Sequence, residues 1–167
     1  MKLTSLVVIF LAVFSSILSA QNRSLPNVNI KTLEGQTISV PTLGATGKIT
    51  VISFWATWCT PCKKELDAVA EVYDEWKEKY DMELIAVTID DARSLPKVKP
   101  MVAEKGWEFT ILSDVNKDMM NALNFQNVPF TFLIDQNGNI VYQHSGYIPG
   151  DENSLEEEIA KLVEKGK

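Results

Sequence analysis

The chain has 167 residues, enough for one ordinary domain with a sizeable core and a short additional segment. Hydrophobic residues make up 46% and charged residues 23% of the sequence, close to the averages for soluble globular proteins, which excludes disordered and collagen-like classes. The formal net charge of -6, without clustered lysine and arginine, argues against a protein that binds nucleic acid.

The N-terminal segment differs from the rest of the chain. Lys2 is followed by an apolar run over residues 6–14 and then by a serine-rich stretch that ends at Ala20. This is the layout of a secretory signal peptide over residues 1–20, and we expect cleavage after Ala20. Leu18 stands where a small residue is preferred, so an uncleaved membrane anchor is the alternative. Both interpretations predict a single domain, residues 21–167, outside the cytoplasm.

The first half of that domain predicts strands followed by a long helix. Residues 28–40 alternate apolar and polar side chains around a turn at 34–35, which predicts an N-terminal hairpin. The nearly continuous apolar run at 49–55 predicts a central strand that is buried on both faces of a sheet. From about Thr60 to Lys79, apolar residues recur with the spacing of an amphipathic helix.

The second half continues this alternation. The predicted elements are a strand at 84–89, a helix at 98–105, a strand at 109–112, a helix at 114–123, a hairpin of strands 130–134 and 140–144 around Asn137-Gly138, and a C-terminal amphipathic helix at 155–163. No repeat or linker interrupts the pattern, so the sequence predicts one α/β domain.

Cys59 and Cys62 are the only cysteines in the sequence. A disulfide that closes so short a loop removes little entropy from the unfolded chain, so the pair is expected to be reactive rather than structural. At the start of the predicted helix, unsatisfied N–H groups and the helix dipole favour a thiolate at Cys59. We expect Cys59 to attack and the more buried Cys62 to resolve. A zinc site is disfavoured, because it needs two further ligands and the chain offers only His144.

The segment 54–65, which reads Phe-Trp-Ala-Thr-Trp-Cys-Thr-Pro-Cys-Lys-Lys-Glu, resembles the active-site segment of the thioredoxin superfamily. It is most similar to that of the TlpA/ResA group of exported reductases, and the resemblance extends over most of residues 25–165. It implies a thioredoxin-like α/β fold with a central mixed sheet flanked by helices. Phe109 to Phe125 would then form the extra strand and helix that this group inserts.

The resemblance also implies a substrate-binding surface around the cysteine pair. Pro129 would be cis and packed opposite Cys59, and the backbone of Val128 would pair with an incoming peptide. An ordinary turn proline is the alternative for Pro129. The other residues expected on this surface are Trp58, Thr60 and Pro61.

Glu65 matches an acidic residue that the TlpA/ResA group places three positions after the second cysteine. Residues i and i+3 share a helix face, so Glu65 is a candidate for proton exchange with Cys62. The alternative is a solvated charge paired with Lys63 or Lys64. Ordinary thioredoxins carry a buried aspartate where Ser53 stands, so a proton relay would use Glu65 instead.

Other positions receive simpler expectations. Phe130 stands where the family usually has threonine, which makes the rim of the groove more apolar. Trp55 is expected in the core and His144 at the surface. Asp90 and Asp91 end a strand on the same face of the sheet and are expected in a solvated loop, with contact to substrate as the alternative.

The function implied by the resemblance is thiol–disulfide exchange on protein substrates, such as apocytochrome c or other periplasmic thiols. It needs no cofactor, and a membrane thiol carrier would supply electrons to a protein that we expect to be monomeric. Thr60-Pro61 lacks the histidine of strong oxidants, which favours a reductant. A non-catalytic binding domain is one alternative. A thiol peroxidase is a weaker one, because such enzymes place their cysteine in a Thr-x-x-Cys context.

Overall fold

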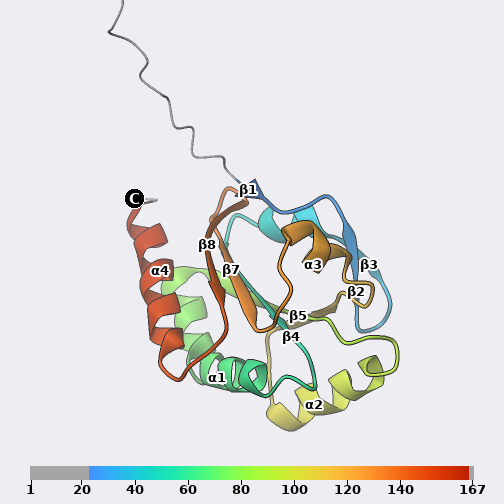
Figure 1. The fold of residues 1–167 in the computed structure, drawn as a ribbon. Coiled ribbons are helices and arrows are strands. Elements are labelled where there is room, and N and C mark those ends of the chain that lie inside the picture. The colour runs from blue at the N-terminus through green and yellow to red at the C-terminus, as the bar shows by residue number, and fades with distance from the viewer. Residues whose placement is uncertain (1–22, 166–167) are drawn as a thin grey trace, which may run out of the picture.

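The computed structural model describes residues 23–165, so the expected signal peptide lies outside the described residues. Within that range, eight strands form one mixed sheet in the order β1-β8-β7-β4-β5-β6-β2-β3. Figure 1 shows this sheet and the helices that surround it. The strands are β1 (Arg23–Ser24), β2 (Asn29–Thr32), β3 (Thr37–Ser39), β4 (Ile49–Trp55), β5 (Met82–Thr88), β6 (Thr110–Ser113), β7 (Phe130–Ile134) and β8 (Asn139–Ser145). The helices are α1 (Thr60–Tyr80), α2 (Val98–Lys105), α3 (Asp118–Leu123) and α4 (Asp151–Lys165), with 3-10 turns η1 (Val40–Gly44) and η2 (Leu95–Lys97).

The strand β4 lies at the centre of the sheet and directs the chain into the candidate site. All seven of its residues are buried, between β5, which runs parallel to it, and β7, which runs antiparallel. The helices α1 and α4 lie side by side on one face (Figure 1). On the other face, Phe125, which follows α3, contacts Phe54 and Phe132 with ring centroids 4.7 and 5.7 Å apart. The expected mixed sheet flanked by helices is confirmed.

Most predicted elements are confirmed, but the starts of two helices are wrong. The C-terminal helix expected at 155–163 begins earlier, at Asp151, because its polar first turn lacks the apolar spacing on which the prediction rests. The helix expected at 114–123 begins only at Asp118, because the preceding residues form a turn. In that turn Lys117 has a left-handed φ of 60°, and the Asp114 carboxylate accepts backbone N–H groups from Met119 and Met120 at 3.3 and 2.9 Å. None of the helices within residues 23–165 is long and apolar enough to cross a membrane.

Two glycines from distant segments meet at the end of the sheet where β4 begins. Gly138, in the turn between β7 and β8, has a φ of 82°, which favours glycine. A Cβ atom on Gly138 would lie 3.0 Å from the Gly44 carbonyl oxygen, and a Cβ atom on Gly44 would lie 3.2 Å from the Gly138 Cα. The hairpin turn therefore packs backbone to backbone against η1.

Candidate active site

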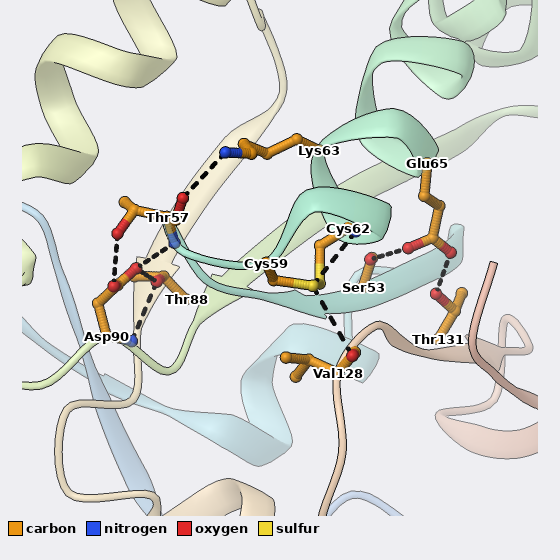
Figure 2. Close-up of a disulfide and its surroundings, with 10 residues drawn as sticks. All are labelled: Ser53, Thr57, Cys59, Cys62, Lys63, Glu65, Thr88, Asp90, Val128 and Thr131. Carbon is orange, nitrogen blue, oxygen red and sulfur yellow. Dashed lines mark hydrogen bonds between the residues drawn. A yellow bond between two sulfur atoms is a disulfide. The ribbon is translucent and has the colours of Figure 1, made fainter.

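The cysteine pair lies at the carboxyl end of β4, where the chain turns into α1, and forms a disulfide (Figure 2). Cys59 is the N-cap residue of α1, and its Sγ accepts a hydrogen bond from the backbone N–H of Cys62 at 3.3 Å. Cys59 is 4% exposed, whereas Cys62 is fully buried. Cys59 is thus the outer sulfur and Cys62 the inner one.

The loop that leads into β7 contacts the disulfide through Val128. The Val128–Pro129 peptide bond is cis, as the resemblance implies. The carbonyl oxygen of Val128 lies 3.7 Å from Cys59 Sγ, a van der Waals contact here because a disulfide sulfur carries no proton (Figure 2). Next to Cys59 in the sequence, Trp58 is 63% exposed, and the side chains of Thr60 and Pro61 are also exposed. The structure therefore brings the expected surface residues together around Cys59.

The side chain of Glu65 is buried one helical turn after Cys62, with only 6% of its surface exposed. Its carboxylate accepts hydrogen bonds from Ser53 Oγ at 3.1 Å and Thr131 Oγ1 at 2.7 Å, both drawn in Figure 2. Burial raises the pKa of Glu65 to about 7, although both hydroxyl groups oppose that shift. The solvated alternative for Glu65 is therefore wrong, and the carboxyl group titrates where proton transfer at neutral pH requires it.

Asp90 corrects an expectation from the sequence, because it lies in the interior rather than in a solvated loop. Its side chain is fully buried and accepts hydrogen bonds from Thr57 N–H at 2.8 Å, Thr57 Oγ1 at 2.7 Å and Thr88 Oγ1 at 2.6 Å. Lys63 Nζ also donates to the Thr57 carbonyl at 3.1 Å (Figure 2). Asp90 and Lys63 therefore fix the loop that leads into Cys59, while Asp91 is exposed as expected.

Three further expectations concern Trp55, His144 and Phe130. Trp55 is fully buried and packs edge-on against Trp107, which confirms its place in the core. His144 is only partly at the surface: its side chain is 37% exposed, and Nε2 lies 3.1 Å from the Asp151 carboxylate. Phe130 is half-buried, and its ring stacks on Phe125 at 4.5 Å. Within residues 23–165, no group of three or more His, Cys, Asp or Glu side chains is arranged to hold a metal ion.

Sequence reasoning identified the cysteines and Glu65 but missed the residues that hold them. Asp90 and Thr131 lie in no motif, and the active-site segment that contains Thr57 does not indicate its role. The hydrogen bonds from Thr57 to Asp90 and from Thr131 to Glu65 join residues 33 and 66 positions apart. The one available signal was the position of Asp90 directly after a buried strand, since the carboxyl ends of parallel strands meet at one edge of a sheet.

Comparison with known proteins agrees with this geometry. Residues 22–143 match the AhpC/TSA family. Thiol-disulfide oxidoreductase ResA of Bacillus thuringiensis (strain Al Hakam) is 34% identical over 124 residues, which cover 74% of this chain and 69% of that protein.

Two solved structures extend the likeness to the fold. An uncharacterized thioredoxin-like protein from Porphyromonas gingivalis is 43% identical, with a TM-score of 0.77 and coverage of 86% of this chain and 94% of the other. A proposed thiol:disulfide interchange protein DsbE from Chlorobium tepidum is 25% identical, with a TM-score of 0.74 and coverage of 85% and 96%. The fold is thioredoxin-like, and the chain belongs to the AhpC/TSA family, among its ResA-like thiol–disulfide oxidoreductases.

Proposed function

We propose that this protein reduces disulfides of protein substrates outside the cytoplasm, through Cys59 and Cys62. The observation that carries the proposal is the position of Cys59 as the N-cap of α1, with the N–H of Cys62 directed at its sulfur. In the dithiol form, this N–H group and the helix dipole would stabilise a Cys59 thiolate, which is the nucleophile in disulfide exchange.

The proposed reaction proceeds in two steps. The Cys59 thiolate attacks a substrate disulfide, so that a mixed disulfide forms and one substrate sulfur leaves as a thiolate. Cys62 then attacks the Cys59 sulfur, which forms the Cys59–Cys62 disulfide and releases the second substrate thiolate. Two electrons pass from the cysteine pair to the substrate, and the Glu65 carboxylate accepts the proton that Cys62 loses before it attacks.

The direction of exchange is inferred from charge. A buried carboxylate near the cysteines disfavours a second negative charge, so a thiolate stabilises the reduced form of this protein less than it stabilises the reduced form of a strong oxidant. A less stable reduced form donates its electrons more readily, which favours reduction of the substrate. The dipeptide Thr60-Pro61, which lacks a histidine, supports the same direction. A membrane thiol carrier would restore the dithiol. The proposed substrates are the disulfides of apocytochrome c or of other periplasmic thiol proteins. The protein is proposed to be a monomer that needs no cofactor.

Export is proposed from the signal-like residues 1–20. Mass spectrometry of protein isolated from its native host should find a chain that begins at Gln21. An intact N-terminus in the membrane fraction would identify an uncleaved anchor instead.

The test of the proposed reaction combines an exchange assay with trapping. The wild-type protein should accelerate insulin reduction by dithiothreitol, whereas Cys59→Ser should abolish the acceleration. Cys62→Ser should accumulate covalent adducts through Cys59, because the mixed disulfide then lacks a resolving thiol. A binding domain would leave insulin reduction at the uncatalysed rate, and a peroxidase would consume peroxide faster than it reduces insulin.

A further inference from the structure

A small cavity adjoins Glu65 on the side of α1 that faces β8 and α4. Its volume is about 10 Å³, near the lower limit for holding a single water molecule. The polar residues that line it are Glu65, Thr131, Tyr142, His144, Tyr147, Asp151 and Glu152. The cavity therefore brings the buried carboxyl group into one space with the partly exposed His144.

The sheet register explains why His144 reaches this space. Thr131 of β7 pairs with Ser53 of β4 on one side and with His144 of β8 on the other. Side chains of directly paired residues lie on the same face of a sheet, so these three form a row across three strands. Glu65 is hydrogen-bonded to the first two members, and His144 is the third and most exposed one.

His144 is held in place by the first residue of α4. The Asp151 carboxylate lies 3.1 Å from His144 Nε2 and also accepts the backbone N–H of Ile148 at 2.8 Å. Both residues affect Glu65 electrostatically. A positive charge on His144 lowers the pKa of Glu65, and the negative charge of Asp151 raises it.

The other titratable groups that face this cavity are Tyr142 from β8, Tyr147 from the following loop and Glu152 from α4. Burial and the adjacent Glu152 raise the pKa of Tyr147 to about 12, and burial also raises the pKa of Tyr142. Both tyrosines therefore stay protonated near neutral pH. Histidine is the side chain that ordinarily changes charge between pH 5 and 8.

We propose that His144, positioned by Asp151, is the group through which Glu65 exchanges protons with solvent across this cavity. The inference rests on the proposed role of Glu65 in accepting the Cys62 proton. After Cys62 has formed its bond to Cys59, protonated Glu65 passes the proton to the imidazole of His144, and His144 releases it to water. Glu65 is then a carboxylate again, and the substrate thiolates take their protons from solvent.

The first test uses the fact that the sequence contains a single histidine. The imidazole resonances of His144 should show two inflections in an NMR pH titration of the wild-type protein, one of them at the pH where Glu65 titrates. Glu65→Gln should remove that second inflection, because coupled sites report each other's charge. A single inflection that is unchanged in Glu65→Gln would overturn the inference.

The second test uses His144→Gln, which retains a hydrogen-bond donor for Asp151. Loss of the positive charge should move the titration of Glu65, followed by carboxyl carbon NMR, to higher pH. Because His144 acts after the resolving step, the return of Glu65 to the carboxylate form, and with it steady-state turnover, should slow by about tenfold or more. Imidazole buffer should restore the steady-state rate, because a mobile base replaces the missing one. Purely structural damage would not be rescued by buffer.

The matched control is Lys48→Gln, which removes a positive charge just before β4, at the opposite end of that strand from the cysteines. It should leave both the rate and the Glu65 titration unchanged. Absence of exchange in the wild-type protein would refute the proposed function itself. Normal exchange that is slowed by Glu65→Gln but not by His144→Gln would refute only the role of His144.

Discussion

Two buried carboxyl groups lie near the cysteine pair, and they differ in the kind of partner they have. Asp90 accepts a backbone N–H and two hydroxyl groups, whereas Glu65 is bonded only to the hydroxyls of Ser53 and Thr131. A backbone N–H can only donate, but a hydroxyl group rotates to donate or accept. The surroundings of Glu65 can therefore accommodate both protonation states, whereas one of the three partners of Asp90 can act only as a donor. The partners, rather than burial alone, separate a structural carboxylate from one suited to proton transfer.

The largest effect is expected from the variant that tests whether Asp90 is a structural carboxylate. Asp90→Ala leaves Thr57 N–H and two hydroxyl groups without their acceptor, so the free energy of unfolding should fall by about 3 kcal/mol or more. Urea denaturation of the oxidised protein measures this loss. Asp91→Ala, at an exposed position, should cost no more than about 1 kcal/mol. Equal losses in the two variants would remove the distinction assigned to Asp90.

Glu65→Gln tests the raised pKa of Glu65 through the pH dependence of the free energy of unfolding. The folded-state pKa of Glu65, about 7, lies above its ordinary value of 4.5, so the folded protein holds this proton more tightly than the unfolded chain. The resulting stabilisation is fully present below pH 4.5 and is lost as the pH rises through about 7. It amounts to about 3 kcal/mol. The difference in unfolding free energy between wild type and variant should change over this range, and a constant difference would contradict the raised pKa.

The same variant tests proton transfer directly. Glu65→Gln keeps the size and polarity of the side chain but cannot titrate, so the resolving step should slow by about 100-fold at neutral pH. Stopped-flow measurement of mixed-disulfide resolution across a pH series provides the rate. Superimposable profiles for wild type and variant would show that the Cys62 proton does not pass through Glu65.

A smaller effect is expected from Thr131→Val, which removes one donor to the Glu65 carboxylate with little change in volume. A hydrogen bond to a charged group contributes about 1.5 kcal/mol, so the pKa of Glu65 should rise by about one unit. Carboxyl carbon NMR measures this shift, and Ser53→Ala should move the pKa in the same direction. A lowered pKa in either variant would mean that the hydroxyl group does not donate to the charged form.

The sequence predicted the elements whose signals are local and could not predict the contacts that join distant segments. The apolar run of β4 and the periodicity of α1 identified both elements closely. The two-residue β1 is too short to carry any pattern and exists through its pairing with β8. Likewise, Glu65 could be placed on a helix face from its spacing, but its burial depends on Ser53 and Thr131, which approach from two other strands. Asp90 was misplaced for the same reason, because Thr57 lies 33 residues before it.

The contact between Gly44 and Gly138 affects which sequence changes this protein can tolerate. Gly44 lies at one end of the sheet and the cysteines at the other, yet the same two strands, β4 and β7, connect them. A methyl group at position 44 would meet the backbone of Gly138 and so would have to displace the β7–β8 turn. The strand β7, which this turn ends, also carries Thr131 in register with Ser53, so the turn and the partners of Glu65 belong to the same pair of strands. Glycine at positions 44 and 138 is therefore a packing requirement at the end of the sheet remote from the disulfide.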